Sequence, residues 1–254
     1  MNQIKPTKFK TWDEFWGKFL QVDFHIENPE RWSFRKKKAE WLLQNASTPA
    51  SSTILDLGCG DGLLDIWLSR MGHRVNAVDR TTTLLDIARN EDDTKSVQFQ
   101  TADLMTVDFE KSSFNLAVMI ETLGLMSAQN DALLLKKCYD WLGKDGKVVI
   151  DIPVEVPKEN NWIKTFTYGT AKCFSRFDAK TRLQYIDFHF EENDGTIFGL
   201  YDPLDKPRYD GPGICRYLYT KDEMRQLLTQ AGFEVAEIPH YYEKDYVAYM
   251  GKKK

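Results

Sequence analysis

An aliphatic strand that leads straight into closely spaced glycines constrains this chain more than any other feature. Residues 54–62 read Ile-Leu-Asp-Leu-Gly-Cys-Gly-Asp-Gly, and the residues that follow have the apolar spacing of a helix. Glycines tolerate positive φ and let a ligand approach the backbone closely. A buried strand, a glycine turn and a helix in this order predict a ligand-binding turn at one edge of an α/β sheet.

Strands and helices alternate through the middle of the chain. The residue pattern predicts strands at 53–57, 74–78, 97–101, 115–120 and 147–152, with helices between them and a turn at 144–146. A final helix is predicted at 221–231, followed by strands at 233–238 and 246–250. This alternation favours a mostly parallel sheet with helices on both faces.

Two segments lie outside this series. Residues 1–50 are predicted to form a helical arm, with a capping box at Thr11 and Glu14 and a second helix that starts near Pro29. Residues 155–215 interrupt the series and contain a predicted hairpin, in which residues 186–190 alternate and 193–195 form the turn. We interpret 155–215 as a cap insertion within a domain that spans 51–254.

Two acidic residues follow the next strands of the series. Asp79 ends the second strand, where a carboxylate can accept hydrogen bonds from both hydroxyls of a ribose. Asp103 comes just after the third strand. Because parallel strands end at one edge of the sheet, both carboxylates are expected near the glycine turn.

These motifs closely resemble those of the class I S-adenosylmethionine-dependent methyltransferases. The family's D-x-G-x-G signature corresponds to residues 56–60, its ribose acid to Asp79, and its A-D-L adenine contact to residues 102–104. Asn115 replaces the family's usual aspartate, and 144–147 read Lys-Asp-Gly-Lys where K-P-G-G is typical. The resemblance implies S-adenosylmethionine as the cofactor, with contacts from Arg35, Asp56, Gly58, Cys59, Gly60, Asp79, Arg80, Asp103, Leu104, Met119 and Ile120.

The resemblance also implies a fold. It predicts a Rossmann-like, seven-stranded, mostly parallel sheet whose last strand is antiparallel. A nicotinamide or flavin enzyme is the rival hypothesis, since it too needs glycines after the first strand and an acid after the second. The dinucleotide fingerprint G-x-G-x-x-G requires a glycine at residue 63, which is Leu63 here. That mismatch favours the methyltransferase.

Composition and charge limit the classes of partner that we expect for this chain. The formal net charge is −4 and hydrophobic residues make up 42%, which is typical of a globular protein. A balanced charge gives no broad basic surface for nucleic acid. No signal-like or membrane-spanning run appears, so we expect a cytoplasmic monomer or homodimer that contacts no membrane. The four cysteines and four histidines form no metal-ligand pattern.

The residues do not single out a general base. Weak candidates, by position alone, are His25, Glu121, Tyr168, His189 and Tyr219, while His73 and His240 are weaker still. The favoured function is methylation of O or N on a small-molecule acceptor, achieved mainly by positioning. The alternatives are a non-catalytic S-adenosylmethionine-binding regulatory module and a protein or RNA methyltransferase, although the N-P-P-Y tetrad of base-modifying relatives is absent after residue 120.

Aromatic residues are unevenly distributed. Residues 1–50 contain nine, 51–154 six, and 155–254 eighteen. Large side chains can bury much surface in a segment that has a small core. We therefore expect most of them to serve packing in the arm and the insertion, and a few to face the acceptor.

Overall fold

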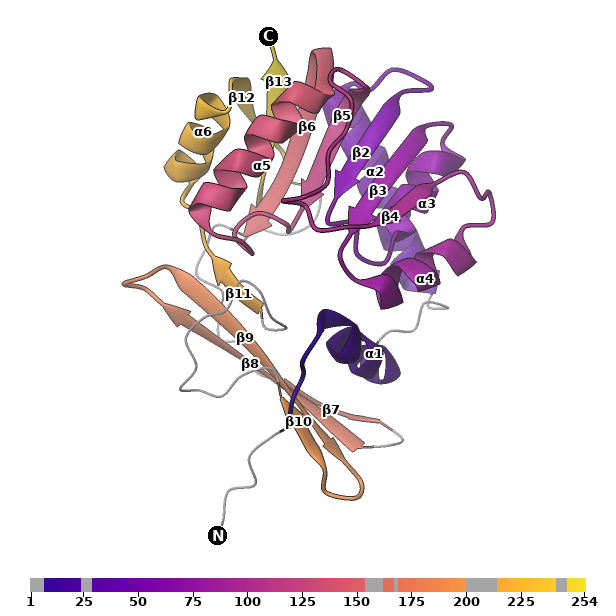
Figure 1. Cartoon of the computed structure of the whole chain (residues 1–254), viewed down its shortest axis with the longest axis vertical. Coiled ribbons are helices and arrows are strands. Elements are labelled where there is room, and N and C mark those ends of the chain that lie inside the picture. The colour runs from indigo at the N-terminus through magenta and orange to yellow at the C-terminus, as the bar shows by residue number, and fades with distance from the viewer. Residues whose placement is uncertain (1–6, 24–28, 154–161, 167–168, 200–213, 241–245) are drawn as a thin grey trace. The chain divides into compact units, whose positions relative to one another are not determined.

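A computed structural model describes residues 7–23, 29–153, 162–166, 169–199, 214–240 and 246–254 (Figure 1). The chain divides into two compact units. One consists of Met1–His25 with Val156–Leu218, and the other of Ile26–Glu155 with Tyr219–Lys254. The segment predicted as a single arm of residues 1–50 is therefore divided between the two units.

The larger unit contains the seven-stranded sheet that the sequence predicts. Its strand order is β12-β13-β6-β5-β2-β3-β4, and β13 runs antiparallel to both of its neighbours. The last strand of the chain thus inserts between β12 and β6, as expected. The strands are β2 (Thr53–Leu57), β3 (Arg74–Asp79), β4 (Gln98–Thr101), β5 (Phe114–Ile120), β6 (Leu142–Pro153), β12 (Phe233–Ile238) and β13 (Tyr246–Lys253).

Helices cover both faces of this sheet (Figure 1). On one face, α2 and α3 bury Leu42, Leu64 and Leu68 against Ile54 and Val149 of the strands. The helix α5 lies on the opposite face, with α6 beside it. The predicted alternation of strand and helix is therefore confirmed. The helices are α2 (Pro29–Ala46), α3 (Leu63–Arg70), α4 (Thr82–Glu91), α5 (Ala128–Trp141) and α6 (Lys221–Gln230).

The strand predicted at 147–152, after a turn, begins earlier than expected. The strand β6 already begins at Leu142, which pairs with Phe114, and the next pair joins Lys147 to Leu116. The intervening residues 143–146 form a bulge in which Asp145 has a φ of 59°. The residues chosen for a turn thus do bend the backbone, but without leaving the sheet.

The smaller unit has a sheet of its own. Its order is β1-β10-β9-β8-β7, and β11 also pairs with β9. The predicted hairpin is confirmed as β9, the turn at 193–195 and β10, whereas the other strands were not predicted. The elements are β1 (Thr7–Lys8), α1 (Trp12–Asp23), β7 (Trp162–Phe166), β8 (Gly169–Asp178), β9 (Leu183–Glu192), β10 (Ile197–Gly199) and β11 (Ile214–Tyr217).

Aromatic packing holds the smaller unit together. Phe15 of α1 is 1% exposed, and its ring lies 5.5 Å from that of Phe188 and 5.7 Å from that of Phe9. Phe190 is fully buried in the same cluster. The predicted helix cap is present, since the amide of Glu14 donates to Thr11 Oγ1 at 3.1 Å. The aromatic excess of these segments thus largely serves to build a core.

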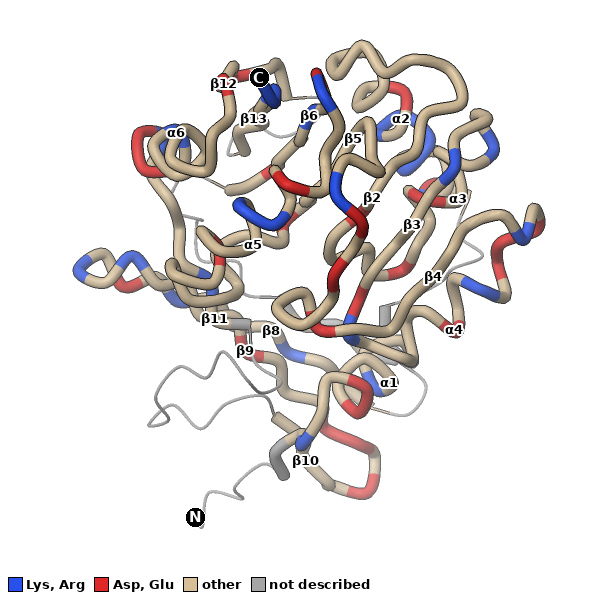
Figure 2. Tube along the Cα trace, turned by 45° about the horizontal axis from the view of Figure 1, so that its top comes forward, with Lys and Arg blue, Asp and Glu red and all other residues tan. Residues whose placement is uncertain are grey.

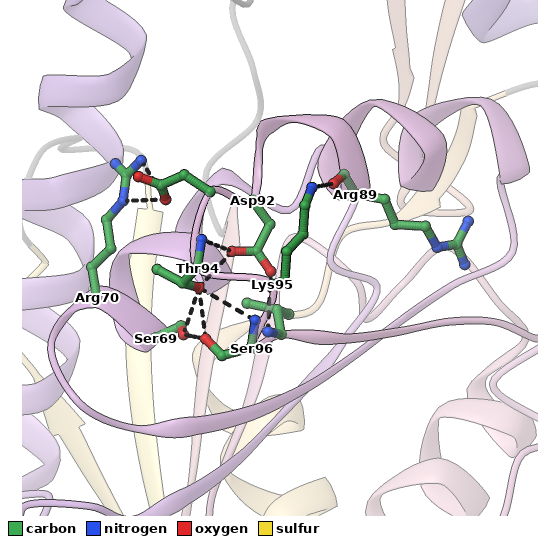
Figure 3. A network of polar contacts seen from close by, with 9 residues as sticks. Ser69, Arg70, Arg89, Asp92, Thr94, Lys95 and Ser96 are labelled. Atoms are coloured by element: carbon green, nitrogen blue, oxygen red, sulfur yellow. Dashed lines mark hydrogen bonds and ion pairs between the residues drawn. The ribbon is translucent and has the colours of Figure 1, made fainter.

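A polar network fastens the amino edge of the large sheet (Figure 3). The carboxylate of Asp92 accepts hydrogen bonds from the amides of Thr94 and Val97, each at 3.1 Å. Ser96 hydrogen-bonds both Thr94 and Ser69 at the end of α3. These contacts fix the turn that leads into β4, at the edge opposite the predicted ligand site.

Candidate active site

The glycine turn between β2 and α3 has the geometry that only glycine accommodates readily. Gly58, Gly60 and Gly62 have φ values of 86°, 55° and 68°. The amide of Gly58 donates to Val78 O at 2.8 Å, which ties the turn to β3. A Cβ on Gly58 would lie 2.6 Å from Thr122 Oγ1, whereas one on Gly60 would meet nothing within 4 Å. The backbone at Gly60 therefore has open space beside it.

Asp79 lies at the carboxyl end of β3, next to this turn. Its carboxylate accepts hydrogen bonds from the amide of Gly60 at 3.0 Å and from the amide of Thr81 at 2.9 Å. Each oxygen has a second lone pair that can accept from another donor. The following residue, Arg80, is exposed.

Asp103 lies beyond the end of β4 and is exposed. Its Oδ1 accepts from the amide of Met105 at 2.8 Å, which orients the carboxylate. Leu104 is half-buried beside it. The amide of Ala102 donates to Asp79 O at 2.9 Å, so the two acidic turns are joined.

These features fit the nucleoside part of S-adenosylmethionine. Gly60, Asp79 and Asp103 follow the adjacent strands β2, β3 and β4, in that order across the sheet. The open backbone at Gly60 and two carboxylates with accepting capacity suit hydroxyl and amino donors. On the neighbouring strand β5, Ile120 is half-buried and Met119 is fully buried.

Two arginines of α2 hold the last acid of the glycine turn. Asp61 is 6% exposed, and its Oδ2 receives Nη2 of Arg31 and, at 3.5 Å, Nη2 of Arg35. Burial by itself would raise the pKa of Asp61, but the charges of Arg35 and Arg31 outweigh it and lower that pKa. Sequence reasoning had singled out Arg35 and had missed Arg31 and Asp61. The spacing of four between the arginines, which places them on one helix face, was the available signal.

A pair of buried carboxyl groups lies beneath the turn. Asp56 is 2% exposed and Asp65 is fully buried. Burial raises the pKa of Asp56 to about 7. Burial and then the charge of Asp56 raise the pKa of Asp65 well above its usual range. Cys59 is also buried, which raises the pKa of its thiol and makes it a poor nucleophile.

Thr122 and Asp131 organise the segment after β5. Thr122 Oγ1 donates to Leu57 O at 2.8 Å, so this segment is fastened to β2. Asp131 is fully buried, and its Oδ2 accepts from the amide of Gly124 at 2.9 Å and from the hydroxyl of Tyr219 at 2.7 Å. Burial raises the pKa of Asp131 to about 7. Tyr219, a candidate base, thus has a structural hydrogen bond.

The remaining candidate bases are Glu121, His189, His25 and Tyr168. His25 and Tyr168 lie outside the described residues. Glu121 is exposed after β5, has a φ of 56°, and accepts a hydrogen bond from Tyr246 at 3.2 Å. His189 lies on β9 in the smaller unit, with its Nε2 2.9 Å from Asp187.

His240, one of the two weakest candidates in the sequence, belongs to a buried polar group at the same edge as the glycine turn. The carboxylate of Asp151 lies 3.0 Å from Nε2 of His240 and 3.5 Å from Nζ of Lys38. Asp151 and His240 are 89 positions apart in the sequence, and Lys38 is more than one hundred positions from either. No local spacing pattern could have linked them.

The described residues contain no group of three His, Cys, Asp or Glu side chains that could hold a metal ion. None of their helices is long and apolar enough to cross a membrane.

Comparison with known sequences identifies a family for the middle of the chain. Residues 54–146 match the family model described as "Methyltransferase domain". The chain is 24% identical over 121 residues to phosphoethanolamine N-methyltransferase of Plasmodium falciparum, covering 47% of this chain and 46% of that protein. It is 25% identical over 210 residues to a putative methyltransferase of Geobacillus sp. strain WCH70, covering 81% and 82%. The chain thus spans about half the length of the first relative and most of the second.

Solved structures of methyltransferases have a fold similar to that of this chain. The amino pentose methyltransferase CalS10 of Micromonospora echinaspora, solved with S-adenosylmethionine bound, superposes with a TM-score of 0.68 at 13% identity. The likeness covers 99% of this chain and 100% of that one. Residues 54–146 thus form a methyltransferase domain, and the chain has the fold of the S-adenosylmethionine-dependent methyltransferases.

Proposed function

We propose that the protein transfers the methyl group of S-adenosylmethionine to O or N of a small-molecule acceptor. The observation that carries this proposal is the open backbone at Gly60, followed across the sheet by the carboxylates of Asp79 and then Asp103. In the proposed complex, Asp79 accepts from the ribose hydroxyls and Asp103 from the adenine amino group. Leu104 and Ile120 supply apolar contacts, and Arg80 lies at the rim. Met119 was expected to contact the cofactor as well, but its side chain is fully buried within the protein.

Arg31 and Arg35 are proposed to serve the methionine end of the cofactor. Both guanidinium groups already converge on Asp61 in the glycine turn. An arginine can donate to several acceptors at once, so these groups can hold Asp61 and a second carboxylate together. Asp61 also keeps them oriented before the cofactor arrives.

The cofactor, when bound, supplies a methyl group that its positively charged sulfur already activates for transfer to a lone pair. The protein's task is then to hold the acceptor in line and exclude water. Gly58 and Thr122 fix the turn against β5, which sets the position of the cofactor relative to the end of that strand. Such positioning can contribute most of the catalysis.

Three observations support a small acceptor over a macromolecule. The relatives named above are described as acting on phosphoethanolamine and on an amino pentose. Lys and Arg are interspersed with Asp and Glu along the described trace (Figure 2). The net charge of −4 does not favour nucleic acid. A cytoplasmic location and a monomeric or homodimeric state stay predictions.

Two measurements test the proposal. Titration calorimetry with S-adenosylmethionine and with S-adenosylhomocysteine should show one site per chain. Incubation with S-adenosylmethionine and a small-molecule extract should then yield S-adenosylhomocysteine and a methylated metabolite, detected by mass spectrometry. Binding without turnover would instead support the non-catalytic regulatory module, and turnover only with proteins or RNA would support a macromolecular acceptor.

A further inference from the structure

Two buried acidic residues flank the glycine turn in the sequence. Asp56 is the fourth residue of β2, and Asp65 lies in the first turn of α3, so residues 57–64 connect them. Asp56 is 2% exposed and Asp65 is fully buried. A contact between their side chains therefore fixes the start of α3 relative to β2, and with it the shape of the turn between them.

Both side chains occupy the layer between the large sheet and the helices α2 and α3. Ile54 of β2 packs against these two helices, and Asp56, two residues further along the strand, points to the same face. The charges of Lys38 and Arg35, both on α2, act on the carboxyl group of Asp56. Because apolar side chains fill much of this layer, a carboxylate that lacks a partner would be costly there.

The carboxyl groups of Asp56 and Asp65 are in hydrogen-bonding contact with each other. Among the described residues, no other group makes a hydrogen bond to Oδ1 of Asp56 or to either oxygen of Asp65. The amide of Asp65 lies near its own carboxyl group, but outside hydrogen-bonding geometry. Two ionised carboxylates are both acceptors and cannot bond to each other. A hydrogen bond between these groups therefore requires that one of them keeps its proton.

The charges around the pair favour ionisation of Asp56 over ionisation of Asp65. Burial is the main influence on Asp56 and raises its pKa to about 7, but the cations of α2 act in the opposite direction. Burial and then the charge of Asp56 raise the pKa of Asp65 well above its usual range, and the charge of Asp61 acts in the same direction. At neutral pH, Asp65 is therefore the residue that keeps a proton. The charged and ionisable groups near the pair are Arg35 and Lys38 of α2, Cys59 and Asp61 of the turn, and Asp79 of β3.

We propose that Asp65 stays protonated at neutral pH and donates a hydrogen bond to the carboxylate of Asp56, and that this bond positions the glycine turn to receive the cofactor. The proton remains on the oxygen of Asp65, and the pair carries one negative charge. The first turn of a helix is a favourable place for such a charge. Because Asp65 is fully buried, it acts as a positioning residue, through the turn that presents the open backbone of Gly60. This inference rests on the proposed function.

Nuclear magnetic resonance of the carboxyl carbons tests the protonation of Asp65 directly. In the unmodified protein with labelled aspartate, the signal of Asp65 is identified by its loss in Asp65→Asn. It should keep the position of a protonated carboxyl group at about pH 8, where exposed aspartates are ionised. The exposed Asp86 of α4 supplies the reference for an ionised group. A signal of Asp65 at the ionised position would overturn the inference.

Two replacements of Asp65 separate the hydrogen bond from the packing of the side chain. Asp65→Asn supplies an N–H donor to Asp56, so the affinity for S-adenosylhomocysteine should stay within about twofold of that of the unmodified protein. Asp65→Leu has a similar volume but no donor. It should weaken this binding about tenfold, because it leaves the carboxylate of Asp56 unsatisfied.

Asp92→Leu is the matched control for loss of a buried carboxylate. Asp92 is also 2% exposed, but it lies at the amino edge of the sheet, where its carboxylate accepts from the amides of Thr94 and Val97. The variant should lower the free energy of unfolding and leave the affinity for S-adenosylhomocysteine unchanged. A loss of affinity as large as that in Asp65→Leu would overturn the inference, because general destabilisation would then explain both.

The Asp65 variants decide between the hydrogen bond and a role in packing alone. Unchanged affinity in Asp65→Leu, or equal losses in Asp65→Asn and Asp65→Leu, would overturn the inference. If Asp65→Leu does not fold, the affinity of Asp65→Asn and the carbon signal of Asp65 decide the matter. Failure of S-adenosylhomocysteine to bind the unmodified protein would instead count against the proposed function, and the carbon signal would still test the protonation of Asp65.

Discussion

The carboxyl edge of the large sheet has two sides, separated by β5, that are built in different ways. The glycine side, at the ends of β2, β3 and β4, relies on backbone shape and on carboxylates held by backbone amides. The histidine side, at β6, β12 and β13, relies on side chains such as Asp151 and His240 that contact one another. A site built on backbone shape leaves a short sequence motif, whereas a site built from side-chain contacts does not.

The largest expected effect is that of Gly58→Ala on the glycine side. The new Cβ would lie 2.6 Å from Thr122 Oγ1, at a φ of 86°. Strain and displacement of Thr122 should cost about 3 kcal/mol and weaken S-adenosylhomocysteine binding about 100-fold. Calorimetry measures this affinity. The control is Gly72→Ala, which shares a positive φ of 91° but has open space around it. Equal losses in both variants would mean that the turn has no special role.

Asp79→Ala should have the next largest effect on cofactor binding. It removes the acceptor that we assign to the ribose hydroxyls and leaves the amides of Gly60 and Thr81 without their partner. The expected loss of S-adenosylmethionine affinity is about 1–3 kcal/mol. The exposed Asp86 of α4 supplies the control, Asp86→Ala. Unchanged binding in Asp79→Ala would show that the ribose does not bind at this position.

Replacing either arginine of α2 should have a smaller effect on cofactor binding. Arg31→Ala and Arg35→Ala should each weaken S-adenosylhomocysteine binding about tenfold or less, because the remaining arginine still holds Asp61. Lys36→Ala, on an exposed face of the same helix, is the control. If Arg35→Ala binds as tightly as the unmodified protein, its assignment to the methionine carboxylate has to be dropped.

Asp131→Asn should leave cofactor affinity unchanged and act on stability alone. The pKa of Asp131 is raised from 3.8 to about 7 in the folded protein, so the folded state holds more protons than the unfolded state between these values. Its contribution to stability is therefore present below pH 3.8 and is lost as the pH rises through about 7. Asparagine can still accept from Tyr219, so the variant should lose less stability across this window.

Denaturant unfolding at several pH values measures that difference. Tyr219→Phe tests the same hydrogen bond from its other end and should keep the pH dependence while lowering stability about 1 kcal/mol. An identical pH slope in Asp131→Asn and the unmodified protein would show that this carboxyl is not the source of the dependence. Asp56 and Asp65, which remain in the variant, would then be the residues to change.

Sequence reasoning succeeded where neighbouring residues decide the structure. The strands at 53–57 and 233–238 have the predicted boundaries, and the antiparallel insertion of the last strand is confirmed. It underestimated the insertion, because only its hairpin has a local turn signal at 193–195. The remaining strands of the smaller unit are held by pairing and by the aromatic core around Phe15, neither of which has a local signature.

By itself, the sequence determined the class of fold and the glycine side of the edge. A buried strand, glycines at fixed intervals and an acid after the next strand are constraints between near neighbours, and chain connectivity enforces them. Only the tertiary structure brought Lys38, Asp151 and His240 together, because these residues come from α2, β6 and the end of β12. Their proximity depends on the order of strands in the sheet and on where α2 packs. The cofactor could therefore be inferred from the sequence, whereas the contacts of this buried group could not.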